Sequence, residues 1–207
     1  MAETGYEFTA DWFSDYRPTW DQLVAQWKPS RILEIGCYEG RATCYLIAAC
    51  SAHHALELHC IDTWEGGTEH AEGAMAAVER RFDRNVDLAR KNAAHPVKLK
   101  KYKEASNRAL LRIAAAEDPS SFDLAYVDGS HQAPDVLTDA VLAFQLVRPG
   151  GLIIFDDYLW YMEQPGKQDA FNMPKPAIDA FVNIFQRKLR VEFGPPLYQL
   201  YVEKLSD

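Results

Sequence analysis

The stretch Arg31-Ile-Leu-Glu-Ile-Gly36-Cys-Tyr-Glu-Gly40 is a short apolar run with an acidic residue near its end, followed by two glycines four positions apart. The run is typical of a buried strand, and a helical pattern follows the second glycine. Glycine lets the backbone turn tightly and approach a ligand closely. Because open α/β sheets bind ligands beyond the carboxyl ends of their strands, the stretch predicts a strand, a ligand-binding loop and a helix in succession.

Other apolar runs repeat this pattern along the chain, with helical patterns between them. They cover residues 56–61, 97–99, 124–127 and 152–155. This alternation favours a parallel sheet with helices on both faces. Two last runs, 189–193 and 197–203, are joined by three residues, a connection that permits only an antiparallel return. We therefore expect an α/β fold with a doubly wound, mostly parallel seven-stranded sheet and a C-terminal antiparallel hairpin.

Composition and charge narrow the class of protein. The chain has 207 residues, with 22 Lys and Arg against 30 Asp and Glu, a formal net charge of −8. This length suits one domain, and the negative charge disfavours nucleic acid or an anionic membrane as the main partner. The N-terminus shows no signal peptide pattern, the apolar stretches are too short to cross a bilayer, and the four cysteines favour reduced core thiols over disulfides or zinc ligands. We expect a cytoplasmic protein.

Three regions are expected within this single unit. Residues 1–30 are interpreted as a helical, aromatic-rich extension that packs on the core, and residues 31–207 as one domain. Residues 158–173 form a long aromatic insertion, and such insertions are more often functional than ornamental, so we interpret them as a substrate lid. The aromatic residues of the extension fit a substrate wall, core packing or a homodimer contact equally well.

Acidic side chains around the glycine loop indicate the charge of its ligand. Glu34 and Glu39 flank the loop, which disfavours a diphosphate and suits a cationic ligand. Glu34 can accept from an ammonium group, and Asp62, which ends the second run, can accept both hydroxyls of a ribose. Taken singly, these residues are equally well explained as turn or capping residues; their combination is more specific.

Together these features resemble the class I S-adenosylmethionine-dependent methyltransferases from residue 31 to residue 204. The resemblance implies that the methionine part of S-adenosylmethionine lies at the glycine loop, the ribose at Asp62 with Trp64 beside it, and the adenine edge at Ser106. The cofactor contacts implied are Glu34, Gly36, Tyr38, Gly40, Asp62, Trp64, Ser106 and Asp128. One departure is Ala42, where many members of the family have a hydroxyl residue.

Three aspartates follow the fourth and fifth runs. Asp128 ends the fourth, and Asp156 and Asp157 end the fifth. Read separately, they are a turn and a solvated pair. Neighbouring parallel strands place their carboxyl ends side by side, however, so the three carboxylates are expected to converge, and a hard cation such as Mg²⁺ would relieve their repulsion.

This second pattern resembles the cation-dependent O-methyltransferases, relatives of which include catechol and macrolide-sugar O-methyltransferases. The resemblance implies that Asp128, Asp156 and Asp157 are metal ligands, and His131 stands where the catechol enzyme has its catalytic lysine. The unperturbed pKa of histidine, ~6.5, suits a general base near neutral pH. The other histidines are interpreted as structural; among them, His70 lies in a segment that could cover the cofactor.

The function expected is Mg²⁺-dependent O-methylation of a hydroxylated small molecule with two neighbouring oxygens, such as a sugar, an aromatic diol or a natural-product intermediate. Three alternatives stay open: a metal-independent methyltransferase, an N-directed one, and a non-catalytic S-adenosylmethionine-binding protein. A nicotinamide-dependent oxidoreductase would carry GxGxxG, which is absent from the sequence. RNA methylation is disfavoured, because this acidic chain offers no broad basic surface for a nucleic-acid backbone.

Overall fold

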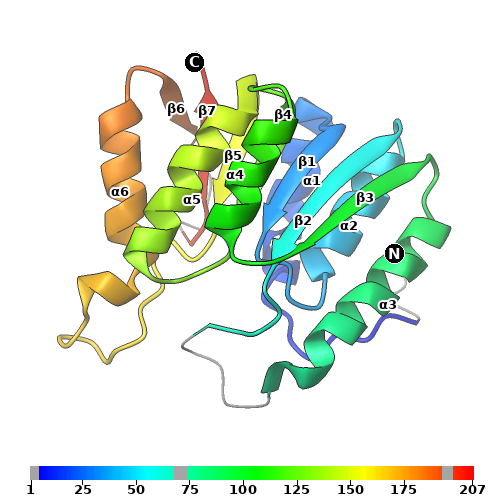
Figure 1. The fold of residues 1–207 in the computed structure, drawn as a ribbon, viewed down its shortest axis with the longest axis horizontal. Coiled ribbons are helices and arrows are strands. Elements are labelled where there is room, and N and C mark those ends of the chain that lie inside the picture. Colours follow the sequence, from blue (N-terminus) through cyan, green and yellow to red (C-terminus); the bar gives the residue numbers. More distant parts are fainter. Residues whose placement is uncertain (1–4, 68–73, 193–197) are drawn as a thin grey trace.

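A seven-stranded sheet forms the centre of the computed structural model, which describes residues 5–67, 74–192 and 198–207 (Figure 1). The strand order is β3-β2-β1-β4-β5-β7-β6. The strands are β1 (Arg31–Ile35), β2 (Leu56–Asp62), β3 (Val97–Lys103), β4 (Phe122–Val127), β5 (Val147–Phe155), β6 (Leu189–Glu192) and β7 (Leu200–Lys204). Strands β1 to β5 pair in parallel, whereas β7 runs antiparallel to both β5 and β6. The predicted doubly wound sheet with its antiparallel hairpin is confirmed.

Helices cover both faces of this sheet (Figure 1). On one face lie α1 (Arg17–Trp27), α2 (Arg41–Ser51) and α3 (Val78–Lys91), and on the other α4 (Ser106–Ala116), α5 (Ala133–Leu146) and α6 (Pro174–Phe185). Three short 3₁₀ helices are η1 (Ser14–Tyr16), η2 (Ala74–Ala77) and η3 (Ala170–Asn172). Since both faces are covered, successive residues of β1 are buried on opposite sides, which explains its nearly continuous apolar run.

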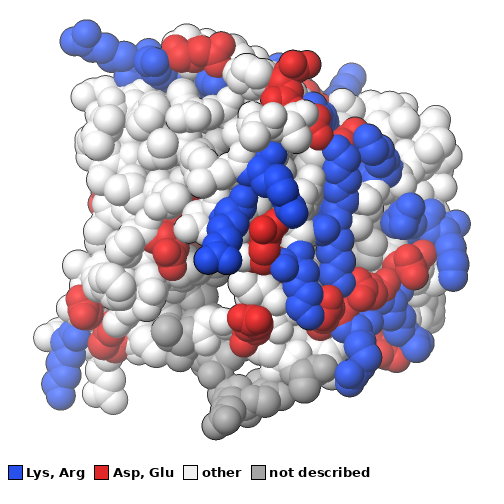
Figure 2. Space-filling model, viewed as in Figure 1, with Lys and Arg blue, Asp and Glu red and all other residues white. Residues whose placement is uncertain are grey.

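Strand β3 extends beyond the predicted 97–99 to Lys103. Its second half was not predicted, because it is rich in lysine and does not form an apolar run. The lysines lie at the open edge of the sheet, where charged side chains discourage pairing with another chain. Lys101 contacts Glu79 at 2.9 Å and Asp83 at 2.6 Å. Figure 2 shows basic and acidic side chains interleaved over this region, so the lysines form no uniform basic patch.

The N-terminal segment packs on the core through Trp20 of α1. Its indole is 1% exposed and meets the rings of Tyr45 and Tyr126 edge-on. This places α1 behind the carboxyl end of β4, close to the aspartates. Among the helices of the described residues, none combines the length and apolar character needed to cross a bilayer.

Candidate functional site

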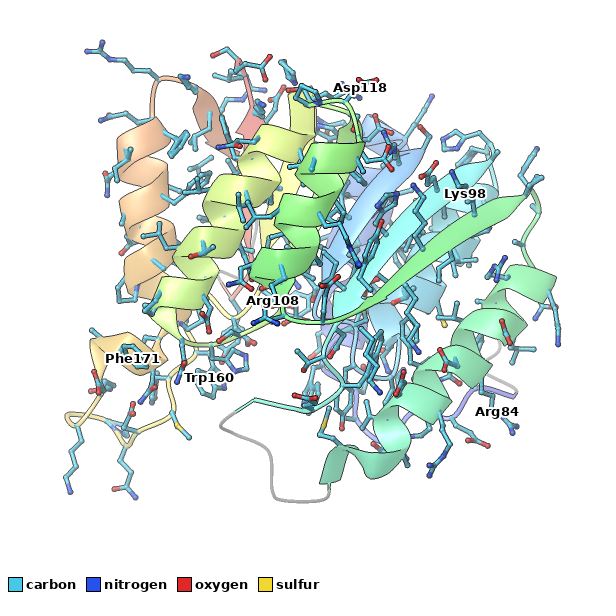
Figure 3. The ribbon with its side chains drawn as sticks, in the orientation of Figure 1. Arg84, Lys98, Arg108, Asp118, Trp160 and Phe171 are labelled. Carbon is cyan, nitrogen blue, oxygen red and sulfur yellow. The ribbon has the colours of Figure 1, made fainter. Side chains whose placement is uncertain are left out.

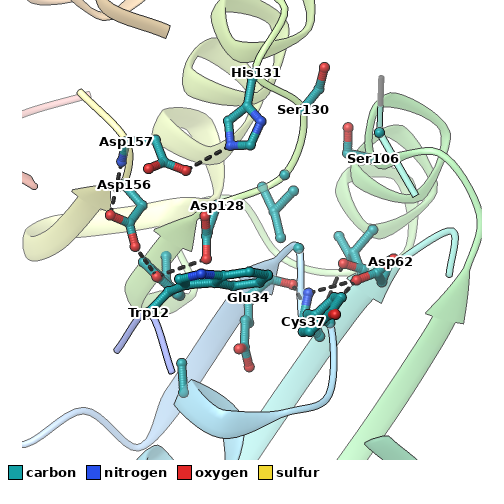
Figure 4. Close-up of a pocket in the computed structure, with 18 of the residues that line it drawn as sticks. Trp12, Glu34, Cys37, Asp62, Ser106, Asp128, Ser130, His131, Asp156 and Asp157 are labelled. Carbon is teal, nitrogen blue, oxygen red and sulfur yellow. Dashed lines mark hydrogen bonds and ion pairs between the residues drawn. The ribbon is translucent and has the colours of Figure 1, made fainter. Parts of the chain in front are cut away.

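A pocket of about 1250 Å³ opens at the carboxyl ends of the parallel strands (Figure 4). Its walls come from the loops that follow β1, β2, β3, β4 and β5, together with the N-terminal segment. Strands β1 and β4 are neighbours here, and the chain leaves β1 in one direction across the sheet and β4 in the other. This is the switch point at which open α/β sheets bind ligands.

The glycine loop is held close to the backbone that follows β4. Gly36 has a φ of +82°, and a Cβ built on it would lie 1.8 Å from the carbonyl oxygen of Asp128. No side chain fits there, because the obstacle is backbone that cannot rotate away. Gly36 therefore allows the glycine loop to pack directly against the backbone of Asp128, so that the predicted cofactor loop and the first aspartate lie side by side.

Asp62 organises the same loop from the end of β2. Its Oδ2 accepts hydrogen bonds from the backbone N–H groups of Cys37 and Tyr38, each at 2.8 Å, and its Oδ1 accepts one from Trp64 N–H at 2.6 Å. These bonds support the positive φ of +48° at Tyr38. Asp62 also lines the pocket. The carboxylate that is predicted to bind the ribose is therefore the one that holds the glycine loop in place.

Glu34 borders the pocket but its side chain is buried. The residue is 1% exposed, and in Figure 4 the carboxylate points away from the aspartates. Its Oε2 accepts from the hydroxyl of Thr43 at 2.7 Å, while Oε1 has no hydrogen-bond partner among the described residues. Burial raises the pKa of Glu34 to about 8, because the charged form is poorly solvated there.

Of the other predicted cofactor residues, two line the pocket and two, Gly40 and Trp64, do not. Tyr38 and Ser106 line the pocket, Ser106 as the first residue of α4. Trp64 is 5% exposed and is not among the lining residues; it packs on Phe82 with ring centroids 4.9 Å apart, and its indole N–H donates to the Tyr38 carbonyl. Trp64 thus supports the loop from behind. His70 falls outside the described residues.

The three aspartates and His131 converge on one wall of the pocket (Figure 4). Asp157 Oδ2 lies 2.7 Å from His131 Nε2, and the imidazole stacks on Trp160 with centroids 4.1 Å apart. Burial and the charges of the neighbouring aspartates raise the pKa of Asp128 well above its usual range and that of Asp156 to about 6. The structure therefore brings together the acidic and basic groups that the sequence placed at separate strand ends.

Sequence reasoning missed the groups that hold these aspartates. The hydroxyl of Tyr126 contacts Asp128 Oδ2 at 2.9 Å and also bonds to Asp156 Oδ2. Gln199, from the turn before β7, donates to Asp156 Oδ2 at 2.9 Å. Tyr126 lies two positions before Asp128, a spacing that places alternate strand residues on one face, but the sequence carries no comparable signal for Gln199.

Aromatic residues form the outer walls. Trp12 is 66% exposed, lines the pocket and packs against Tyr38 with centroids 5.0 Å apart. Trp160 lies on the connection between β5 and α6, and Phe171 projects from the same connection in Figure 3. Exposed apolar side chains of this connection are Leu159, Tyr161, Met162 and Phe171.

The described chain holds two tighter groups of potential metal ligands, one of them bordering the pocket. In each, three ligand atoms lie within 4.8 Å of one another, closer together than those of the three aspartates. One group is Glu34, Cys37 and Cys60; the other is Glu57, His59 and Glu117. Burial raises the pKa of both thiols in the first group, which keeps them protonated and poor ligands. The second group lies against Lys100 and Arg31, each of which contacts both glutamates.

Comparisons of sequence and of structure identify proteins that are similar to this chain. The chain is 39% identical over 54 residues to the uncharacterized protein R132 of Acanthamoeba polyphaga mimivirus, a match that spans 26% of this chain and 24% of that relative. It resembles an O-methyltransferase from Bacillus cereus in complex with S-adenosylhomocysteine, with a TM-score of 0.62 and 19% identity over 95% of this chain and 84% of that one.

A further solved structure is MycE, a methyltransferase from the mycinamycin biosynthetic pathway in complex with Mg, S-adenosylhomocysteine and mycinamycin VI. Its TM-score is 0.60, with 18% identity over 95% of this chain and 51% of that one. At these identities, the two solved structures establish the fold. A family model described as "Methyltransferase domain" matches residues 33–158, more than half of the chain, and spans the glycine loop, His131 and all three aspartates. The chain therefore belongs to this methyltransferase family, as the resemblance in its sequence predicted.

Proposed function

We propose that this protein transfers a methyl group from S-adenosylmethionine to a hydroxyl oxygen of a small molecule, with Mg²⁺ bound by Asp128, Asp156 and Asp157. The observation that carries the proposal is the convergence of these carboxylates and His131 on one pocket wall beside the glycine loop. The volume of about 1250 Å³ leaves room for a nucleoside cofactor and an acceptor together.

The donor set fits a hard divalent cation. All three ligands offer carboxylate oxygens, which Mg²⁺ prefers over nitrogen or sulfur. The raised pKa values of Asp128 and Asp156 reflect burial and like-charge repulsion, and a bound cation would relieve that repulsion. When bound, the cation would lower the pKa of a substrate hydroxyl and favour two neighbouring substrate oxygens. The Mg present in the MycE complex supports this choice of ion.

The chain's own residues supply the remaining steps. The glycine loop and Asp62 would place the sulfonium, so that the S–CH₃ bond breaks as the new O–CH₃ bond forms in line with it. His131 would accept the hydroxyl proton, since its ring is held at the pocket wall by Asp157 and Trp160. Residues 158–173 would close over the acceptor, with Trp160 as the part that already lines the pocket.

Labelled S-adenosylmethionine tests this function directly. Methyl transfer to a panel of sugars, aromatic diols and hydroxylated natural-product intermediates is measured with Mg²⁺ and with excess chelator. We expect transfer that stops in chelator and returns with Mg²⁺, and we expect Asp156→Asn to abolish turnover while binding of S-adenosylhomocysteine is retained. Full activity of the wild type in chelator would exclude the metal from the reaction and favour the metal-independent alternative.

That alternative has one observation in its favour. Tyr126 and Gln199 provide hydrogen bonds to Asp128 and Asp156, so these carboxyls have partners without a cation. Amine acceptors in the same panel separate N-directed from O-directed transfer, and S-adenosylhomocysteine binding without transfer to any acceptor would favour a non-catalytic protein. A cytoplasmic location and a homodimer remain predictions; buried free thiols at all four cysteines are consistent with the former.

A further inference from the structure

A buried tyrosine lies between two of the proposed metal ligands. Tyr126 is 2% exposed, and its hydroxyl bonds to Oδ2 of both Asp128 and Asp156. The phenol carries one hydrogen, so it can donate to only one carboxyl at a time. This single hydroxyl therefore stands between two acidic groups and lies within hydrogen-bond reach of both.

Asp156 is fixed by two further donors. Gln199 Nε2 donates to its Oδ2 at 2.9 Å, and the backbone N–H of Asp157 donates to its Oδ1 at 2.8 Å. The amide of Gln199 is itself oriented, because its Oε1 accepts from Trp20 Nε1 and from the Tyr201 hydroxyl, each at 2.8 Å. Helix α1 and β7 therefore orient the Gln199 amide that donates to this carboxylate.

The ring of Tyr126 cannot move away from this position. Trp20 packs edge-on against it, with centroids 4.8 Å apart and planes at 88°. Trp20 and Gln199 are each 1% exposed, so no water competes for their hydrogen bonds from the side of the core. A rigid ring with its hydroxyl at the pocket floor can set the separation of the two carboxylates before any ligand arrives.

We infer that Tyr126 is a positioning residue whose hydroxyl pre-organises Asp128 and Asp156 for a divalent cation, an inference that rests on the proposed metal-dependent function. Hydrogen bonds from outer residues orient metal ligands, and their loss typically weakens metal affinity by about 10- to 100-fold. Without the hydroxyl, the two carboxylates would repel each other and rotate apart, and cation binding would have to restore their arrangement. The aromatic ring alone would preserve the packing on Trp20.

The variant Tyr126→Phe tests this, because it removes the hydroxyl and keeps the ring. Mg²⁺ binding is measured by calorimetry, and Mn²⁺ binding by electron paramagnetic resonance, on the full chain saturated with S-adenosylhomocysteine. We expect the Kd for both ions to rise about 10- to 100-fold, with affinity for S-adenosylhomocysteine unchanged. Tyr45→Phe is the matched control: its hydroxyl donates to Asp21 at 2.8 Å and its ring also packs on Trp20, but it touches none of the three aspartates. Its metal affinity should equal that of the wild type.

The outcomes separate the inference from the proposed function. If the wild type binds either ion and Asp156→Asn does not, the metal site is established; an unchanged or lower Kd in Tyr126→Phe would then overturn the inference alone. If wild type and Asp156→Asn show the same weak binding, both proposals are wrong. Should Tyr126→Phe fail to fold, Gln199→Met removes the other side-chain donor to Asp156 and is expected to weaken cation binding in the same direction.

Discussion

Substitution of Gly36 by alanine tests how the cofactor loop is built. The added Cβ would meet three backbone atoms: the carbonyl oxygen and carbon of Asp128 at 1.8 Å and 2.4 Å, and the Cα of Gly129 at 2.8 Å. The positive φ of +82° adds a conformational cost for any residue with a Cβ. Because backbone cannot rotate aside as a side chain does, the loop and the segment after β4 must move apart.

The magnitude follows from these two costs. A left-handed conformation costs roughly 1–2 kcal/mol, and overpacking typically costs about 1–3 kcal/mol, which gives about 2–5 kcal/mol together. For a chain of this size, each kcal/mol lowers Tm by about 2–4 °C, so Gly36→Ala is expected to lower Tm by roughly 5–20 °C. Since Asp128 moves with the obstructing backbone, affinity for S-adenosylhomocysteine should fall as well.

Gly166→Ala is the matched control. Gly166 has a similar φ of +86°, but nothing lies within 4 Å of the position of its Cβ. This substitution carries only the conformational cost, so thermal unfolding should show a smaller loss of Tm and calorimetry an unchanged affinity for S-adenosylhomocysteine. If Gly36→Ala lowered Tm no more than Gly166→Ala, the close approach between the glycine loop and Asp128 would not exist in the protein.

Two other predictions concern titratable groups. His131→Ala is expected to lower the rate of methyl transfer while leaving the Kd of S-adenosylhomocysteine unchanged, because the imidazole lies with the acidic groups and not in the glycine loop; an unchanged rate would remove His131 from the reaction. Glu34 has a folded pKa of about 8 against an ordinary value of 4.5, so it stabilises the fold fully below about pH 4.5 and loses that contribution as the pH rises toward 8. The free energy of unfolding, measured with urea between pH 5 and pH 8, should therefore rise for Glu34→Gln relative to the wild type as the pH rises. The same pH dependence in both proteins would contradict the burial of an ionisable carboxyl at this position.

The sequence was informative where local pattern and sheet geometry agree. Asp128 and Asp156 are 28 positions apart in the chain, yet their convergence follows from one rule: parallel neighbours end on the same edge of the sheet. His131 could be placed for the same reason, being three residues beyond a strand end. The second half of β3 was not predicted, because its lysines interrupt the apolar run that indicates a strand. Such charged residues are typical of an edge strand.

Orientation within the site was beyond the sequence. The predicted contact of Glu34 with the cofactor's ammonium group stays a prediction; what the sequence did not indicate is that the buried carboxylate accepts a hydrogen bond from Thr43. The position of Trp64 beside the ribose likewise stays a prediction, and the sequence did not indicate that its ring packs on Phe82. In both cases the strand or loop was placed correctly, while the contacts of the side chain depend on which neighbours fill the space around it.

The sequence by itself determined the succession of strands and helices, the glycine loop and the edge at which the acidic groups gather, because these follow from hydrophobic periodicity and from the directions of parallel strands. Only the tertiary structure decided that Tyr126, Gln199 and Trp20 hold those groups in place. The hydrogen bond between Trp20 and Gln199 joins residues 179 positions apart. No local pattern encodes which buried donors and acceptors meet when an N-terminal helix packs against the turn that precedes a C-terminal strand.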